Sequence, residues 1–542
     1  MKQIFYLILI LIVPQFFIFG YITYNSKEQK KEIKLVNYTK KTDRIERKVV
    51  DHTKFKVLQK DFERPQDVTL ACLSCHTERH GEIMANNHWT WNRKEKLLGR
   101  GVVSVGKKNI LNNFCIGISA HEKTCTRCHI GYGWDDNNFD FTKKENIDCL
   151  VCHDQSGMYK KAKGQGGRPE AGLNLNVISQ SVGSPKRANC GVCHYWGGGG
   201  NGVKHGDMEV AMNNCSREVD VHMTTDGEDM SCIECHKTEN HQITGKLYAL
   251  SSENINRVNC EQCHTDKPHT DEILDQHLYR IACQTCHIPI YAKVNSTKMW
   301  WDWSQAGRLD KEGKPIHETD ADGNHNYLGI KGSFVWDDHV IPEYYWFNGL
   351  ANHFLITDTI KSEPLQMNSL EGSYKDKGEN CETSSCSKIW PVKVHRGKQP
   401  YDVVYNKLVQ PKLWAPRKGD SAYWSDFDWD KSIIAGMKYL NLPYSGQYGF
   451  IETEMYWPLN HQVSPADKSL QCLDCHTSNK SGRLANLRDF YLPGRDHFAI
   501  IDNIGIACII LALIGVVIHG GIRIVLRRNC LHNKKYNKIE NH

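Results

Sequence analysis

Eight copies of the pattern C-x-x-C-H are the residues of this 542-residue chain whose types and spacing indicate a specific chemistry. Each copy supplies two thiols that can form thioether bonds to haem vinyl groups, and one imidazole that can bind the haem iron. Zinc sites pair their half-motifs and do not close every one with histidine. A disulfide framework needs no histidine at all. The pattern therefore predicts eight covalently bound haems of the c type.

Each motif defines three residues of a predicted haem site. The thioether cysteines are Cys72, Cys75, Cys125, Cys128, Cys149, Cys152, Cys190, Cys193, Cys232, Cys235, Cys260, Cys263, Cys283, Cys286, Cys472 and Cys475. The motif histidines are His76, His129, His153, His194, His236, His264, His287 and His476. An electron-transfer haem also needs a second, distal histidine, and about six of the following eight are expected to serve. The candidates are His88, His205, His222, His241, His269, His277, His395 and His461.

The stretch from Cys125 to Lys161 contains the second and third motifs. It is unusual because a lysine pair, Lys160 and Lys161, follows the third motif. An iron without two histidines keeps an open face or a displaceable ligand, and small molecules react at such a site. A lysine amine binds a metal only when it is deprotonated, which burial beside the metal promotes. These residues alone leave open whether either lysine is a ligand or an ordinary exposed side chain.

The elements that position these motifs are harder to predict. We expect a mainly α fold with much irregular structure, in which eight haems form the core and membrane segments flank it. A helix is predicted over 271–280, and glycine tracts at 164–167 and 197–202 predict loops. Such loops are simple turns or places where the backbone closely approaches a haem or substrate.

A section without haem motifs, 288–471, holds ten of the fourteen tryptophans. We interpret it as a structural lobe whose indoles pack on haem edges and on one another. Cys381 and Cys386 in this lobe can pair as a small disulfide, which suits an oxidising compartment.

Apolar segments at both ends predict attachment to a membrane. Residues 1–26 are a signal peptide or, as their length favours, an uncleaved signal anchor. A charged stalk is expected over 27–66 and the octahaem catalytic domain over 67–497. A transmembrane helix is predicted over 498–526. The basic tail, 527–542, is then cytoplasmic and the haem domain is on the periplasmic side. His519 is either a helix-packing residue or a contact to a haem b or quinol site. Nucleic acid is not an expected partner, because haem c is attached outside the cytoplasm.

Several longer strings together resemble the octahaem tetrathionate reductase family of multihaem cytochromes c, over about residues 52–480. They span 71–76, 88–91, 112–115, 131–134, 149–154, 157–161, 221–223, 282–289 and 395–402. This resemblance implies one catalytic haem, the second in chain order, whose iron is bound by a lysine despite the ordinary motif Cys125–His129. Lys161 is the preferred ligand, ahead of Lys160.

The same resemblance implies reduction of tetrathionate to thiosulfate, and of nitrite and hydroxylamine to ammonium. The expected partners are a small anion and either a quinol-linked membrane cytochrome or a periplasmic electron donor. Arg127, Lys143 and Lys144 are candidates for attracting the anion. Cys115 is a catalytic thiol of the same pocket or a buried structural cysteine. The membrane-spanning C-terminus departs from a soluble form in the family, which leaves the donor open.

Two other functions remain open at this point. A hydroxylamine oxidoreductase-like enzyme would need long C-terminal helices and a cross-linked tyrosine beyond the last motif, and the chain has little room for them before residue 498. A membrane-anchored, quinol-linked electron-transfer cytochrome would carry out no substrate chemistry of its own. Eight bis-histidine haems would favour this second alternative.

Overall fold

The computed structural model describes residues 50–97, 99–245, 257–376 and 387–536. It divides into two units at Ser469, and each unit is described by itself. The predicted N-terminal membrane segment, the first part of the stalk and the Cys381–Cys386 pair lie outside the described residues.

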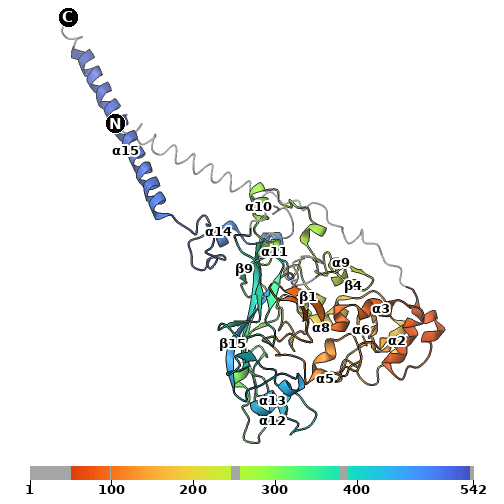
Figure 1. The fold of residues 1–542 in the computed structure, drawn as a ribbon. Coiled ribbons are helices and arrows are strands. Elements are labelled where there is room, and N and C mark those ends of the chain that lie inside the picture. The colour runs from red at the N-terminus through yellow and green to blue at the C-terminus, as the bar shows by residue number, and fades with distance from the viewer. Residues whose placement is uncertain (1–49, 98, 246–256, 377–386, 537–542) are drawn as a thin grey trace. The chain divides into compact units, whose positions relative to one another are not determined.

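The first part of the larger unit consists of short helices joined by irregular backbone (Figure 1). Most of the C-x-x-C-H motifs form single helical turns, which place both cysteines and the histidine of a motif close together. The predicted helix before the seventh motif is present as α10. The helices are α2 (Pro65–Leu73), α3 (Arg79–Met84), α4 (Asn87–Thr90), α5 (Glu122–Cys125), α6 (Leu150–His153), α7 (Leu175–Gln180), α8 (Arg187–His194), α9 (Cys232–Cys235), α10 (Glu272–His277) and α11 (Cys283–His287). Two small hairpins accompany them, β1 (Arg93–Leu97) with β2 (Gly101–Val105) and β3 (Thr238–Glu239) with β4 (Gln242–Ile243).

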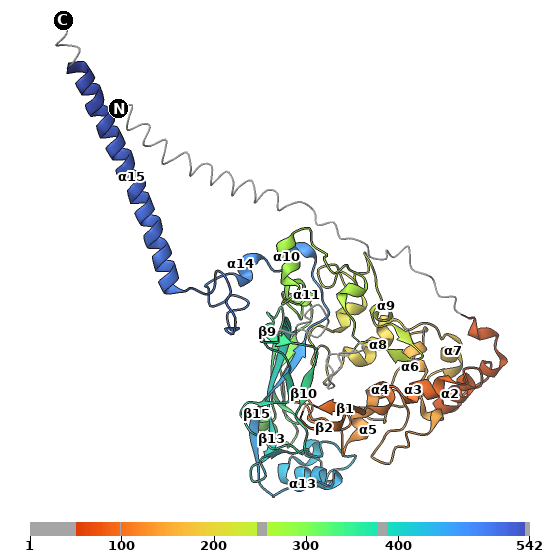
Figure 2. The ribbon, with the colours of Figure 1, turned by 45° about the horizontal axis from the view of Figure 1, so that its top comes forward.

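The motif-free section folds around a nine-stranded sheet in the order β11-β15-β13-β5-β8-β7-β6, with β9 and β14 also paired to β13 (Figure 2). Its strands are β5 (Thr297–Asp302), β6 (His317–Thr319), β7 (His325–Leu328), β8 (Gly332–Asp337), β9 (Glu343–Phe347), β11 (Leu365–Gln366), β13 (Lys388–Asp402), β14 (Lys407–Leu408) and β15 (Tyr448–Pro458). A separate pair joins β10 (Ala351–His353) to β12 (Asn368–Leu370). Helices α12 (Tyr423–Asp426) and α13 (Trp429–Tyr439) pack here, and Trp301 and Trp303 lie in the same buried core.

This sheet corrects the expectation of a mainly α chain. The long strand β13 pairs with β15 over its entire second half, and residues 391–395 of β13 are all buried. A strand buried on both faces lacks the alternation of polar and apolar residues that identifies strands in a sequence. The pattern of polar and apolar residues therefore did not predict the sheet.

The described end of the predicted stalk, residues 50–66, packs on the motif region. Leu58 is buried, and the side chain of Gln180 in α7 donates a hydrogen bond to its carbonyl. Phe62 packs against a small core that includes Val68 of α2 and Ile178 of α7. This packing brings His52 into the motif region.

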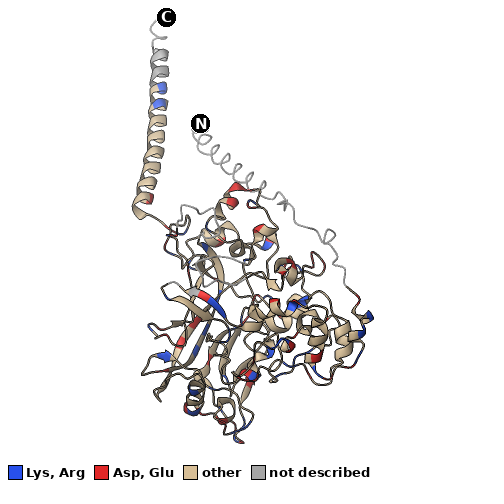
Figure 3. Ribbon diagram, turned by 45° about the vertical axis from the view of Figure 1, so that its right-hand side comes forward, with Lys and Arg blue, Asp and Glu red and all other residues tan. Residues whose placement is uncertain are grey.

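The smaller unit contains α14 (Cys472–Cys475), which carries the eighth motif, and the long helix α15 (Ala499–Tyr536). Arg495 organises the segment between them: it is buried and donates hydrogen bonds to the carbonyls of Leu484, Leu487 and Phe490. Residues 499–528 of α15 include an 18-residue stretch with a mean hydropathy of 2.5, and the helix is long and apolar enough to cross a membrane. The ribbon in Figure 3 is coloured as charged only near the two ends of the described part of this helix, and the sequence has Asp502 near one end and Arg523, Arg527 and Arg528 near the other.

Candidate haem sites and the second motif

Six motif histidines each face a second histidine from another part of the larger unit. The ring centroids are 6.0–6.5 Å apart, too far for direct bonding between the rings. A metal–imidazole bond is about 2 Å long and each ring centroid lies about 1 Å beyond its bonded nitrogen, so two histidines on one iron have centroids about 6 Å apart and each pair fits an iron between its rings. The pairs are His76–His52, His153–His241, His194–His88, His236–His461, His264–His222 and His287–His269.

The hydrogen bonds of these histidines point to the same role. In most of them Nδ1 is bonded to an oxygen acceptor, which leaves Nε2 directed at the partner ring. A ligand histidine characteristically uses its other nitrogen in this way, since the bond fixes its tautomer and orientation. The bonded groups are His52 with Val50, His88 with Asn86, His153 with Gly183, His236 with Thr244, His241 with Glu82, His269 with Asp275 and His461 with Asp207. His277 and His476 show the same pattern in their own units.

Five of the eight predicted distal candidates lie opposite a motif histidine: His88, His222, His241, His269 and His461. The sequence reading missed His52, because its charged surroundings resemble a linker. The other three candidates, His205, His277 and His395, are in none of these six pairs. His205 packs against Trp457, with ring centroids 5.0 Å apart, and Nδ1 of His395 lies 3.1 Å from Oδ1 of Asn113.

The histidine of the second motif differs from those six. His129 is fully buried, and its Nε2 lies 2.6 Å from the carbonyl oxygen of Trp89, to which it donates. Five aromatic rings surround it at centroid distances of 4.9–6.0 Å: Trp89, Trp91, Trp134, Phe139 and Phe141. Gly131 makes this packing possible, because a Cβ there would lie only 2.7 Å from the His129 ring. The nitrogen that would bind iron is therefore used inside the protein.

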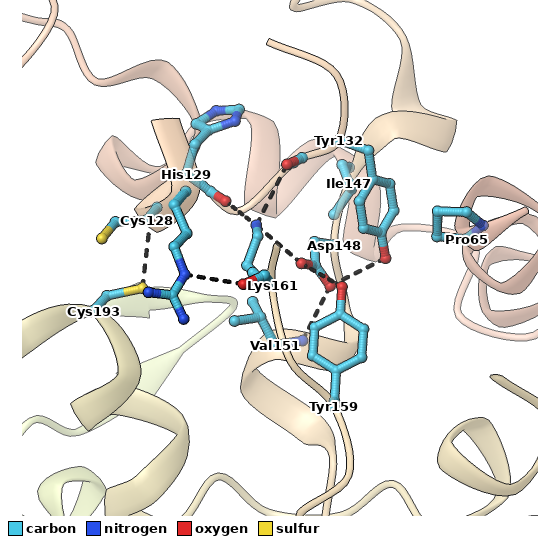
Figure 4. A network of polar contacts seen from close by, with 12 residues as sticks. Pro65, Cys128, His129, Tyr132, Ile147, Asp148, Val151, Tyr159, Lys161 and Cys193 are labelled. Carbon is cyan, nitrogen blue, oxygen red and sulfur yellow. Dashed lines mark hydrogen bonds and ion pairs between the residues drawn. The ribbon is translucent and has the colours of Figure 1, made fainter. Parts of the chain in front are cut away.

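Lys161 lies beneath the same motif, at the backbone of His129 (Figure 4). Its side chain is 1% exposed, and its amine donates to the carbonyls of His129 and Gly131. The amine also lies 3.1 Å from the carboxylate of Asp148. Lys160, the other predicted candidate, is exposed. Of the pair, the structure brings only Lys161 to the second motif.

Asp148 is held by four donors in this network. Its Oδ1 accepts from the Tyr132 hydroxyl and the Val151 amide, each at 3.0 Å, and its Oδ2 accepts from the Tyr159 hydroxyl at 2.8 Å and from Lys161. Burial and the Asp148 carboxylate raise the pKa of both tyrosines well above the ordinary value, so both hydroxyls stay protonated and donate. Tyr132 and Tyr159 lie in two of the strings that carry the family resemblance, 131–134 and 157–161, but the sequence assigned no role to either tyrosine or to Asp148.

The predicted glycine loop at 164–167 also reaches this place. Gly167 has φ +82°, and a Cβ on it would lie 2.3 Å from the carbonyl oxygen of Gly131 and 3.4 Å from the Lys161 amine. The amide groups of Gly133 and Trp134 both donate to the carbonyl of Gly166. The tract therefore packs closely against the backbone of the second motif and against Lys161, and its predicted approach to a haem or substrate stays a prediction.

Attachment cysteines of different motifs lie near one another. The neighbouring thiols join the first motif to the third, the second to the fourth, the fourth to the fifth and the sixth to the seventh. The pairs whose thiols shift one another's pKa are Cys72–Cys149, Cys128–Cys193, Cys190–Cys232 and Cys260–Cys283. The sulfur of Cys193 in the fourth motif also lies 3.8 Å from the Cys128 carbonyl oxygen of the second motif.

Paired histidines at iron-spanning distances, each beside a C-x-x-C-H motif, define a multihaem cytochrome of the c type. The comparisons with known proteins agree. A family model described as "Cytochrome c bacterial" matches residues 298–479. The crystal structure of an octahaem cytochrome c from Shewanella oneidensis superposes with a TM-score of 0.72 and 42% identity, covering 80% of this chain and 95% of that one. An uncharacterised protein of Archaeoglobus fulgidus is 23% identical over 246 residues, covering 36% of this chain and 81% of that protein. The chain belongs to the octahaem cytochromes c, and the prediction of covalently bound c-type haem is confirmed.

Proposed function

We propose that this cytochrome is a reductase whose second haem, on Cys125 and Cys128, is the catalytic one and has Lys161 as its protein ligand. The observation that carries the proposal is that the motif histidine is bonded within the protein while a lysine amine lies beside the motif. Nε2 of His129 is bonded to the Trp89 carbonyl, whereas the buried amine of Lys161 lies at the motif backbone. One strong protein ligand leaves the opposite face of the iron for a substrate.

The reaction we propose first is the reduction of tetrathionate. Two electrons break its central S–S bond and yield two thiosulfate ions, and no proton is consumed. Nitrite and hydroxylamine are the other proposed substrates, reduced to ammonium with uptake of protons. When bound, the haem supplies electrons to the substrate at its iron. The protein's own part is to hold Lys161 through Asp148 and to keep His129 away from the iron.

The remaining haems are proposed to deliver the electrons. The Cys193 sulfur of the fourth motif lies 3.8 Å from the Cys128 carbonyl oxygen of the second motif, and Cys190 of the fourth motif lies near Cys232 of the fifth. The paired histidines of those two motifs, His194 with His88 and His236 with His461, suit haems that carry electrons without binding substrate. The fourth haem is therefore the proposed point at which electrons pass to the catalytic one.

Steady-state assays of the purified holoprotein with reduced viologen test this proposal. We expect turnover with tetrathionate, nitrite or hydroxylamine, together with one haem whose electron paramagnetic resonance signal differs from those of bis-histidine haems. If the protein turns over none of the three and all its haems are bis-histidine and low-spin, it is an electron-transfer cytochrome without substrate chemistry.

We further propose that α15 anchors the protein in the membrane, with the haem motifs on the periplasmic side. Support comes from its apolar length and from Arg523, Arg527 and Arg528 at its far end. His519 lies exposed on the described helix, where a membrane partner could contact it. The electron donor proposed for this arrangement is a quinol-linked membrane protein.

Ending the chain after residue 498 tests the anchor. Most of the protein is expected to move from the membrane fraction to the soluble fraction, because about thirty apolar residues are removed. Viologen-driven activity per haem is expected to stay within about twofold, since the removed helix carries no haem motif. Retention of the shortened chain in washed membranes would show that another segment anchors it.

A further inference from the structure

Three of the six histidine pairs contain a ring that donates a hydrogen bond to a carboxylate. An ionised carboxylate can only accept, so Nδ1 of each of these rings carries the hydrogen and Nε2 is left to face the iron. The pairs belong to the third, fifth and seventh motifs. The distances from Nδ1 to the carboxylate oxygen are 2.7 Å for His241 and Glu82, 3.2 Å for His461 and Asp207, and 2.9 Å for His269 and Asp275.

The three carboxylates differ in burial and in what else they bind. Asp207 is buried, and its oxygen that faces the histidine ring also accepts from the backbone amides of residues 460 and 461. The side chain of Asp275 is 12% exposed. Glu82 lies 2.5 Å from the guanidinium of Arg79, which balances part of its charge. We therefore expect Asp207 and Asp275 to affect a neighbouring iron more strongly than Glu82 does.

The distal histidines of the first and fourth motifs face neutral oxygen atoms instead. Nδ1 of His52 lies 2.9 Å from the carbonyl oxygen of Val50. Nδ1 of His88 lies 2.9 Å from Oδ1 of Asn86. The amide nitrogen of Asn86 donates to the carbonyl of His241, so its oxygen is the atom that faces His88. A neutral acceptor orients the ring as a carboxylate does, but it brings no net charge.

A carboxylate bonded to a ligand histidine changes the iron in a definite direction. The histidine becomes more basic, and it gives the iron more electron density. The negative charge itself also favours ferric over ferrous iron. Both effects lower the reduction potential of the haem. At the sixth motif, Nδ1 of His222 lies 3.7 Å from Asp220, beyond hydrogen-bonding distance, so this ring gains less from its carboxylate.

We propose that Glu82, Asp207 and Asp275 are tuning residues, which hold the third, fifth and seventh haems at lower reduction potentials than the fourth. Electron transfer between the neighbouring fifth and fourth haems then runs toward the fourth. The fourth motif is also the one whose Cys193 sulfur lies 3.8 Å from the carbonyl oxygen of Cys128 in the second motif. The use of this order in delivering electrons rests on the proposed function, which makes the second haem catalytic. The order of potentials itself does not.

Spectroelectrochemical titration of the holoprotein without substrate tests the proposal. Asp207→Asn, Asp275→Asn and Glu82→Gln each keep an oxygen that can accept from Nδ1 but remove the charge. Each variant is expected to move one one-electron component to a more positive potential. In the two aspartate variants the ferrous form of one haem gains about tenfold, which is about 59 mV for one electron, and Glu82→Gln shifts its component less. Asp428→Asn, which changes a carboxylate paired with Lys431, is expected to leave every component in place.

A further variant locates the fourth haem in the titration. His88→Met replaces its distal histidine, and methionine ligation raises the potential of a haem. The electron paramagnetic resonance signal of one bis-histidine haem is expected to change with it. In the wild type, the component that moves in His88→Met is expected to lie above the component that moves in Asp207→Asn.

If the amide variants hold their haems but leave all potentials unchanged, the carboxylates only orient the rings, and the proposal is overturned. A component of the fourth haem at or below that of the fifth would overturn the proposed order. Because no substrate is present, these measurements do not depend on turnover. The expected shifts in a protein that reduces nothing would contradict the proposed reductase function and leave the tuning residues in place.

Discussion

Replacement of Lys161 by methionine is expected to lower viologen-driven reductase activity at least about 100-fold. Loss of the groups that only support a metal ligand typically costs about 10- to 100-fold, and a ligand itself should matter no less. Methionine keeps most of the volume of a side chain that is 1% exposed, but removes the amine that lies 3.1 Å from Asp148. Steady-state rates, together with the electron paramagnetic resonance spectrum of the catalytic haem, measure the effect.

Lys160→Met is the matched control, since Lys160 is adjacent in sequence but exposed. Its activity is expected to stay within about twofold of the wild type. The Lys161 variant leaves the Asp148 carboxylate buried without the amine that lies 3.1 Å from it, and loss of such a buried donor costs about 1–3 kcal/mol in stability. The visible absorbance of the other haems therefore has to show that the variant is folded and loaded. Full activity in a loaded Lys161 variant would exclude the lysine from the mechanism.

Asp148→Asn is expected to reduce activity about 10- to 100-fold and to raise the reduction potential of the catalytic haem. The substitution keeps the size of the side chain and removes the negative charge beside Lys161, and a nearby negative charge favours ferric over ferrous iron. Asp148 is thus a positioning residue that acts through Lys161. Spectroelectrochemical titration measures the potential, which a purely structural role for Asp148 would leave unchanged.

Tyr159→Phe is the graded control for this network. It removes one of the hydroxyls that donate to Asp148 but leaves the Tyr132 hydroxyl and the Val151 amide in place. A loss of less than about tenfold is expected, with a smaller shift of potential. If Asp148→Asn alters stability alone, with wild-type rates and potentials, the carboxylate does not position the lysine.

The sequence by itself determined the haem chemistry of this protein. Thioether attachment requires two cysteines and a histidine within one helical turn, so all the information for attachment lies in five consecutive residues. The chain shows that signal at each of its motifs, from Cys72 to His476. Local context also pointed to five histidines that the structure places opposite a motif histidine, and the lysine pair was recognised as unusual.

Only the tertiary structure decided which groups meet at the second motif. His129 was predicted as an ordinary ligand, and its aromatic surroundings come partly from Trp89 and Trp91, more than thirty residues earlier. Lys160 and Lys161 are the same residue type, so the residue type alone does not distinguish them. Adjacent side chains point in different directions, and only the Lys161 amine reaches Asp148. His52, from the segment expected to be a stalk, lies opposite His76, and the long strand β13 pairs with β15. Both arrangements depend on long-range packing, which leaves no periodic pattern in the sequence.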